Sequence, residues 1–552
     1  MSRSLLNRFD RLASNVSSAA SQALDKRQQP STPSPATAAH GTMVNPYYAI
    51  RVIDAITNRG IPLVYLRTTY KTIYMTDSAG YVAFNEPGLM TGEPIWVTVS
   101  SYGYESPTGF LGVPGTQIYP KAAGAIDIKL TRTQIAERLY RLTGYGIYRD
   151  SVLLGKPVPL EQPVLNAKVA GSDTIQCAKF KDKLLWMWQD TDQLAFQLGN
   201  FAMTGAWTEL PHKLDADRGL NFDYFTKDNK PNEFARGMIH VHLQAPGNSP
   251  LWVDGLTVTP DETGHERLVA TYYASGHGFS CVERGLAVWN DKRQILERLV
   301  KFDGSKGGVN VLAPGGHTVY VNENGIRYAF YGKNIRVKAD FNSASQQSQY
   351  EAFTCLSADG QRAKRGPNGS LIWSWVKGGR PVNYENADRL VQSGVISQEE
   401  SPYRLMDVET GQAISAHTAG IAWNPYLKLW VNIFQQQGGD TTAGEIWFST
   451  AQAPEGPWTA CRKVATHHMD RDGLNNNSND LYNPVQHFEL MRDGGRYIYF
   501  SGTLTNTFSG NQFPTPYYNY NNIMYRLDLK DPRLKLPHPP AALWGTRPDE
   551  KA

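Results

Sequence analysis

The sequence predicts an all-β protein, a five-bladed β-propeller preceded by an Ig-like β-sandwich. The chain of 552 residues combines 29 Tyr, 13 Trp and 20 Phe with 49 Gly and 33 Pro, a mixture typical of many short strands joined by tight turns. Short apolar runs bounded by Gly, Asn and Asp recur along most of the chain. After residue 169 these runs fall into repeated groups of three or four strands, as in propeller blades.

The composition excludes several other classes of protein. Hydrophobic residues at 41% and charged residues at 19% are globular values that allow a large core. The net charge of +4 is small, and no basic stripe is interleaved with aromatic residues, so nucleic acid is not an expected partner. No run reaches the roughly 18 apolar residues of a membrane span. The oligomeric state stays open.

The first 45 residues are rich in Ser, Ala, Thr and Pro and are predicted to form a disordered tail. The alternative is an amphipathic anchor, because Leu5, Leu6, Phe9 and Leu12 share one helical face. The segment lacks the apolar stretch of an ordinary secretory signal peptide.

Residues 46–131 are predicted to form the β-sandwich, because short alternating strands follow one another with turns such as Asn58-Arg59-Gly60 between them. This segment resembles the regulatory-like sandwich found beside carboxypeptidases and many carbohydrate-active enzymes. The residues that carry the resemblance are Val52, Asp54, Gly60, Pro62, Leu63, Thr76, Asp77, Gly80, Phe84, Gly103 and Tyr104. It implies an accessory module without chemistry of its own.

A linker over residues 132–168 follows, and the apolar spacing of residues 134–142 predicts a short helix there. The propeller is predicted over residues 169–535, with a C-terminal tail over 536–552. Its five units open with strands at 173–180, 252–258, 317–321, 420–423 and 485–490. Residues 370–416 are irregular and could hide a further blade, so a count of six or seven stays open.

Polar residues gather where the inner strands of the predicted blades begin and in the loops on the same face. The predicted substrate-binding side chains are Asp190, Trp188, Trp252, His317, Tyr331, Arg336 and His417. Planar aromatic faces and charged hydrogen-bonding groups are what a sugar-binding site needs.

Glycosidic cleavage requires one protonated carboxyl group and one ionised carboxylate. Carboxylates that converge on one axis raise each other's pKa, which helps to keep one of them protonated near neutral pH. Asp173 is the predicted base or nucleophile, Asp254 the orienting or pKa-tuning carboxylate, and Glu445 the acid.

At these residues the chain resembles the five-bladed propeller glycosidases of the arabinanase, xylosidase and fructosidase group. It also resembles related D-arabinan-degrading propellers, in which a Gly-x-Asp strand precedes an aromatic run that ends in Asp-Thr. Here those elements are Gly171-Ser172-Asp173 and Trp186-Met187-Trp188-Gln189-Asp190-Thr191. The resemblance implies a hydrolase that cleaves a polysaccharide or oligosaccharide, and this substrate favours an extracellular, periplasmic or cell-surface location.

A histidine ligates a structural axial ion in some of these glycosidases. The resemblance therefore implies an axial metal ion such as calcium, with His487 as the candidate ligand, and no other cofactor.

Two other functions stay open. In a polysaccharide lyase, His417 or His487 with a tyrosine would abstract the proton beside a uronate carboxylate, and Lys333 or Arg336 would neutralise that carboxylate. In a non-catalytic protein, the propeller would bind glycans or serve as a scaffold.

Overall fold

The computed structural model describes residues 45–230, 233–241, 250–276, 280–302, 312–438, 444–467, 480–505, 515–517 and 520–543. The predicted N-terminal tail lies outside the described residues, apart from Asn45, as does the end of the predicted C-terminal tail. The described chain is built of β-sheets joined by turns and a few short helices. Within it, no helix has both the length and the apolar character needed to cross a membrane.

The N-terminal module consists of two four-stranded sheets, in the orders β4-β1-β8-β6 and β3-β2-β5-β7. The strands of the first sheet are β1 (Tyr48–Asp54), β4 (Tyr81–Phe84), β6 (Tyr104–Glu105) and β8 (Ala125–Arg132). Those of the second are β2 (Tyr65–Thr68), β3 (Ile73–Met75), β5 (Ile95–Ser100) and β7 (Thr116–Ile118), and η1 (Phe110–Gly112) precedes β7. Alternate residues of both sheets, such as Ile50, Val52 and Val99, share one buried core, which is the arrangement of a sandwich.

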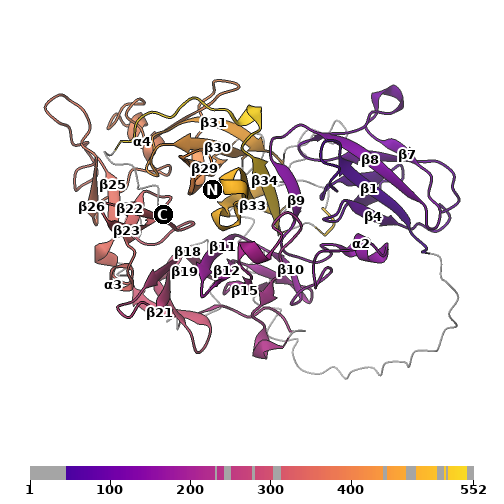
Figure 1. Cartoon of the computed structure of the whole chain (residues 1–552), viewed down its shortest axis with the longest axis horizontal. Coiled ribbons are helices and arrows are strands. Elements are labelled where there is room, and N and C mark those ends of the chain that lie inside the picture. The colour runs from indigo at the N-terminus through magenta and orange to yellow at the C-terminus, as the bar shows by residue number, and fades with distance from the viewer. Residues whose placement is uncertain are drawn as a thin grey trace.

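Five further sheets form the propeller within the described part of the chain, and Figure 1 shows them arranged in a ring with the sandwich at one side. Blade 1 contains β11 (Ile175–Phe180), β12 (Lys183–Trp188), β15 (Thr204–Thr208) and β16 (Asp223–Tyr224). Blade 2 contains β18 (Leu251–Pro260), β19 (Glu266–Ser275), β20 (Cys281–Asn290), β21 (Ile295–Lys301) and β17 (Ile239–His240). Blade 3 contains β22 (Val319–Glu323), β23 (Ile326–Tyr331), β24 (Ile335–Lys338), β25 (Glu351–Thr354) and β26 (Ser374–Lys377).

Blade 4 contains β28 (Ala416–Asn424), β29 (Leu429–Gln436), β30 (Ile446–Ala451), β31 (Trp458–Ala465) and β27 (Tyr403–Asp407). Blade 5 contains β32 (Asp480–Gln486), β33 (Tyr497–Thr505), β34 (Asn521–Asp528) and β9 (Glu137–Arg141). A small sheet beside blade 1 pairs β10 (Val169–Ser172), β13 (Thr191–Gln193) and β14 (Phe196–Asn200). The innermost strands are β11, β18, β22, β28 and β32.

The short helices lie in the connections. They are α2 (Arg149–Leu153), α3 (Phe341–Ala344), α4 (Ala387–Gln392), η2 (Pro211–Lys213), η3 (Lys227–Asn229), η6 (Gln347–Gln349), η7 (Phe488–Leu490), η8 (Asp493–Gly495) and η9 (Pro532–Leu534). The irregular residues 370–416 hold no further blade, because β26 completes blade 3 and β27 pairs in parallel with β31 of blade 4. The predicted count of five is therefore the observed one.

The helix predicted over residues 134–142 is wrong, because β9 occupies this segment and pairs antiparallel with β34. All five residues of β9 are buried, since the strand is covered on both faces. A strand buried on both sides shows no polar alternation, and Ala136, Leu139 and Tyr140 then have the spacing of a helical face. The helix of the linker is α2, further along.

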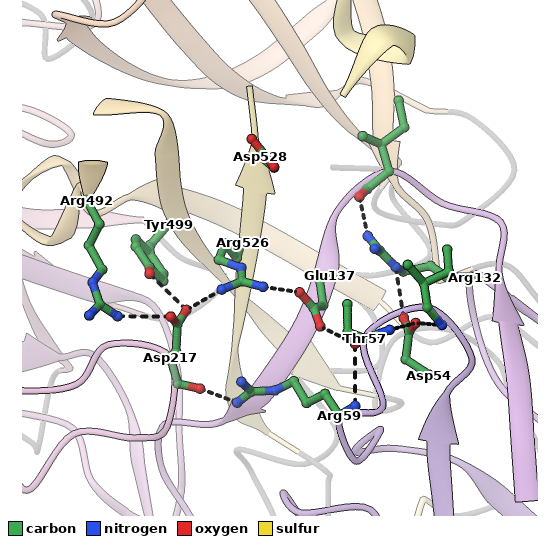
Figure 2. Close-up of polar contacts among 12 residues, drawn as sticks. Asp54, Thr57, Arg59, Arg132, Glu137, Asp217, Arg492, Tyr499, Arg526 and Asp528 are labelled. Carbon is green, nitrogen blue, oxygen red and sulfur yellow. Dashed lines mark hydrogen bonds and ion pairs between the residues drawn. The ribbon is translucent and has the colours of Figure 1, made fainter. Parts of the chain in front are cut away.

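Strand β9 closes the propeller ring, since it precedes blade 1 in the chain and forms the outer strand of blade 5. A network of charged and polar side chains connects β9 and the neighbouring blades to the sandwich (Figure 2). Asp217, in the loop between β15 and β16, accepts hydrogen bonds of 2.9 Å from three side chains, those of Arg492, Tyr499 and Arg526. Its carbonyl oxygen accepts a hydrogen bond from Arg59 of the sandwich.

The same network includes Glu137 of β9. Its carboxylate accepts hydrogen bonds from Arg526, at 2.6 Å, and from Thr57 of the sandwich, at 3.0 Å. Blade 1, blade 5 and the sandwich thus meet at one network of charges, and the sandwich is part of the closure of the ring (Figure 2).

Candidate functional site

Asp173 lies between β10 and β11, where the chain enters the innermost strand of blade 1. Its carboxylate accepts hydrogen bonds from Tyr482, at 2.7 Å, and Tyr520, at 2.8 Å. The backbone N–H and the hydroxyl of Thr174 donate to the same carboxylate at 2.5 and 3.0 Å. Four donors therefore surround one half-buried carboxylate, and each of them favours its ionised form.

Asp190 lies beside Asp173, in the short connection from β12 to β13. The backbone N–H of Asp173 donates to the carbonyl oxygen of Asp190 at 2.9 Å, which holds the two segments together. The carboxylate of Asp190 accepts one hydrogen bond, 2.8 Å long, from the indole N–H of Trp252. The two residues are close because β11 and β12 form an antiparallel hairpin, in which Ile175 lies opposite Trp188.

The two carboxyl groups have unequal environments. Burial and, to a smaller extent, the nearby charge of Asp173 raise the pKa of Asp190 to about 7, whereas the bond from Trp252 opposes the rise. Burial also raises the pKa of Asp173, but the bonds from Tyr482, Tyr520 and Thr174 counteract it. The two groups titrate as a coupled pair, in which Asp173 has four hydrogen bonds that favour its ionised form and Asp190 has one.

Asp254, on β18 of blade 2, is held by two groups that converge on the same oxygen. The amide of Gln176 donates to Oδ1 at 3.1 Å, and the backbone N–H of Gly316 donates to it at 2.8 Å. Lys333, in the turn between β23 and β24, forms an ion pair of 2.8 Å with Glu385. Tyr384 and the carboxylates of Glu385 and Asp254 raise the pKa of Lys333, so its ammonium group stays charged beside Asp254.

Of the predicted aromatic residues, only Trp252 adjoins the carboxylates. Its ring is half-buried and stacks on Tyr273 with 6.0 Å between the centroids and 4° between the planes. Trp188 is fully buried in the core of blade 1, edge-on to Phe222 at 5.0 Å. Tyr331 is also fully buried, and its hydroxyl bonds to Thr257. The predictions that Trp188 and Tyr331 contact substrate are therefore wrong.

The side chain of Arg336 also makes its contacts within its own blade, blade 3. It forms ion pairs with Glu323 and Glu351, and its guanidinium carbon lies 4.0 Å from the ring centroid of Tyr328 and 4.1 Å from that of Trp375. These contacts fill the planar faces and the edge of the guanidinium group, so Arg336 serves packing within blade 3 and not substrate binding.

His417 and Glu445, both in blade 4, have different environments. His417 begins β28 and is exposed; burial of part of the ring and the charge of Lys333 lower its pKa, so it is mostly neutral near pH 7. Glu445 precedes β30, with only 2% of its surface exposed. Its role as the acid stays a prediction.

The predicted axial ion does not fit the residues at the axis. Cys177, His317 and Glu489 have ligand atoms within 4.8 Å of one another, but this set offers one carboxylate, whereas calcium takes six to eight oxygen ligands. Zinc would need a free lone pair on His317, and both ring nitrogens already lie against backbone carbonyl oxygens, 2.9 Å from that of Gln486 and 2.6 Å from that of Cys177.

His487, the predicted ligand, does not belong to this set, and its role as a metal ligand stays a prediction. Its ring is completely buried, and its Nε2 bonds to the hydroxyl of Ser501 at 2.8 Å. Burial lowers the pKa of His487 well below its ordinary value, so the ring is neutral, and it lies edge-on to His317 at 6.2 Å between centroids.

The sequence reasoning did not identify Tyr482, Tyr520 or Gln176 as site residues. Tyr482 and Tyr520 follow Asp173 in the chain by 309 and 347 residues. One available signal was that Tyr482 directly precedes the polar cluster at 483–487, at the entry of the last blade.

No family model matches the sequence, and no curated protein is similar to it. Among solved structures, the exo-beta-1,3-galactanase from Phanerochaete chrysosporium aligns at 8% identity and a TM-score of 0.33, over 66% of this chain and 64% of its own. A thermostable family-43 glycoside hydrolase aligns at 10% identity and a TM-score of 0.30, over 67% of this chain and 97% of its own. A GH43_1 enzyme from Xanthomonas citri aligns at 10% identity and a TM-score of 0.31, over 65% and 87%. The architecture of this chain is established by its own strand order: an all-β protein with a five-bladed β-propeller.

Proposed function

We propose that this protein is a glycoside hydrolase that cleaves a polysaccharide or oligosaccharide at the carboxylate site formed by Asp173, Asp190 and Asp254. The observation that carries the proposal is the pairing of Asp173 and Asp190 in unequal environments. A pair of carboxyl groups, one ionised and one protonated near pH 7, is the minimum equipment for cleaving a glycosidic bond.

Asp173 is the base or nucleophile in this proposal. Its four hydrogen-bond donors stabilise the carboxylate and fix the orientation of both oxygens. As an ionised group it either activates water or attacks the anomeric carbon.

Asp190 is the acid. Its pKa of about 7 keeps much of it protonated at neutral pH, so it can donate a proton to the leaving oxygen. Trp252 orients this carboxyl group through its indole N–H, and the Trp252–Tyr273 stack presents an aromatic surface beside it. Such a surface suits the apolar face of a sugar ring.

Asp254 keeps the role of an orienting carboxylate. It is fixed by Gln176 and Gly316 and lies beside the positive charge of Lys333. This arrangement is suited to binding a sugar hydroxyl group, with Asp254 as acceptor and Lys333 as donor.

Glu445 is the second candidate for the acid, and a comparison of two variants separates it from Asp190. A leaving group such as a nitrophenolate needs no proton, so loss of the acid spares the cleavage of aryl glycosides but not of polysaccharides. If Asp190 is the acid, Asp190→Asn loses activity on the polysaccharide and keeps it on the aryl glycoside, whereas Glu445→Gln keeps both. The opposite pattern would assign the acid to Glu445, and loss of both activities in Asp190→Asn would give Asp190 another role.

A further inference from the structure

We propose that His317 is a buried imidazolium that takes the place predicted for an axial metal ion and positions Asp254. Both ring nitrogens of His317 face a backbone carbonyl oxygen. Nδ1 lies 2.9 Å from the carbonyl oxygen of Gln486, and Nε2 lies 2.6 Å from that of Cys177. A carbonyl oxygen can only accept, so each nitrogen must donate. A neutral imidazole carries one N–H, and the two bonds together therefore require the protonated ring.

A carboxyl group lies near the ring of His317 and can supply a counter-charge. The carboxylate of Glu489, in η7, has an oxygen 3.8 Å from Nε2 of His317. Its other oxygen has no hydrogen-bond partner among the described residues. The other titratable groups around the ring are the thiol of Cys177 and the neutral ring of His487, and neither supplies a negative charge. Burial raises the pKa of Glu489 and the charge of His317 opposes that rise, and among the described residues Glu489 is the carboxyl group that lies against the ring and can balance an imidazolium.

The ring of His317 contacts innermost strands of two other blades. The carbonyl oxygens of Cys177 and Gln486 lie on β11 and β32, the innermost strands of blades 1 and 5, whereas His317 lies two residues before β22 of blade 3. Innermost strands have one edge without a neighbouring strand, and their carbonyl groups need donors. One ring therefore cross-links three blades at the axis, which is the role that a structural cation would have there.

The ring of His317 is connected to the carboxylate site through residues adjacent in the sequence to Cys177 and His317. Gln176 precedes Cys177 in the chain, Gly316 precedes His317, and both donate to Oδ1 of Asp254. The bond between His317 and Cys177 thus fixes the two segments that hold Asp254. His317 is therefore a positioning residue for Asp254, and this last part rests on the proposed hydrolase function.

The protonation state and the metal content can be tested without any activity. Neutron diffraction from a deuterium-exchanged crystal at pH 7 should show deuterium on both nitrogens of His317 and on only one of His487, which is the internal control. Elemental analysis of the protein should show substoichiometric metal, and EDTA should leave the Tm unchanged. Deuterium on only one nitrogen of His317, a proton on Glu489 instead, or a stoichiometric metal that is lost in His317→Gln would overturn the proposal.

The variants Glu489→Gln and His317→Gln test the linkage. Glu489→Gln keeps the shape but removes the counter-charge, and His317 should then lose one of its two ring deuterons in the same neutron experiment. An unchanged ring would refute the pairing.

With an active enzyme, His317→Gln should lower kcat by about tenfold to a hundredfold, because small misplacements of a reacting group have effects of this size. KM should change little, and Gln should retain more activity than Ala because it can still donate to one carbonyl. An unchanged kcat in a folded His317→Gln protein would remove the positioning role. If the protein hydrolyses nothing, the proposed function fails, and the neutron and metal results still decide the imidazolium.

Discussion

Replacement of Asp190 by Asn should abolish hydrolysis of the polysaccharide and at the same time stabilise the protein at alkaline pH. The folded state holds the pKa of Asp190 at about 7, whereas the ordinary value is 3.8. Between these two values the unfolded chain releases the proton and the folded protein keeps it, so the free energy of unfolding falls as the pH rises from about 4 to about 7. Above pH 7 the whole penalty is present.

The difference between 3.8 and about 7 corresponds to at most about 4 kcal/mol, at about 1.4 kcal/mol per pKa unit. Because Asp190 is partly exposed, solvent screening reduces this to about 1–3 kcal/mol. We therefore expect the unfolding free energy of Asp190→Asn to exceed that of the wild type by about 1–3 kcal/mol at pH 8 and to match it near pH 4. Active sites often lower the stability of the folded protein in this way.

Urea denaturation at a series of pH values measures this difference. The control is Asp182→Asn, which removes one exposed carboxylate from a turn of the same blade and should change stability little at any pH. An Asp190→Asn protein that is less stable than the wild type at pH 8, or equally more stable at both pH values, would refute the assignment of a raised pKa to Asp190.

Three further predictions concern the surroundings of the site. Asp217→Ala should lower the free energy of unfolding by about 2–4 kcal/mol, because it leaves two arginines and a tyrosine without their shared acceptor; a loss below about 0.5 kcal/mol in urea denaturation would show that this network does not hold the ring closure. Trp188→Ala should cost about 3–5 kcal/mol of stability and leave KM unchanged in the folded fraction, whereas a raised KM with normal stability would return Trp188 to the substrate surface. Tyr482→Phe removes one donor to Asp173, so the acidic limb of the pH–rate profile should move to higher pH and kcat should fall by roughly tenfold; an unmoved limb would contradict the role of this bond.

The fold was largely predictable from the sequence because strands with one polar face alternate visibly, as in β8 and β18. The exception was β9, which is buried on both faces and therefore has no polar alternation. Local spacing could not show that this segment pairs with β34 from the other end of the chain, a contact that depends only on ring closure.

The site was predictable in part. Asp173 and Asp254 were predicted from their places at strand entries, Asp190 from a loop on the same face and Trp252 as an aromatic neighbour, and the structure gathers them at one end of blades 1 and 2. The errors at Trp188, Tyr331 and Arg336 have one cause. The sequence shows which residue types lie near a strand end, but not which face of the blade each side chain takes.

The proposed role of His317 could not be predicted from the sequence. The sequence analysis predicted His317 as a substrate-binding residue, and its proposed role as a charged donor comes from the groups that surround its ring. Those groups are backbone carbonyls, which every residue has, so the amino-acid sequence does not reveal them.

The measurement that tests the central claim most directly is a product screen. Purified wild-type protein, Asp173→Asn and the control Asp182→Asn would be incubated with a panel of neutral and uronic-acid polysaccharides, with reducing ends and near-ultraviolet absorbance read together. The account predicts that the wild type and Asp182→Asn release reducing ends without absorbance and that Asp173→Asn releases none while remaining folded. Hydrolysis that survives in Asp173→Asn, products that absorb as a lyase's would, or no product from any polysaccharide would contradict it.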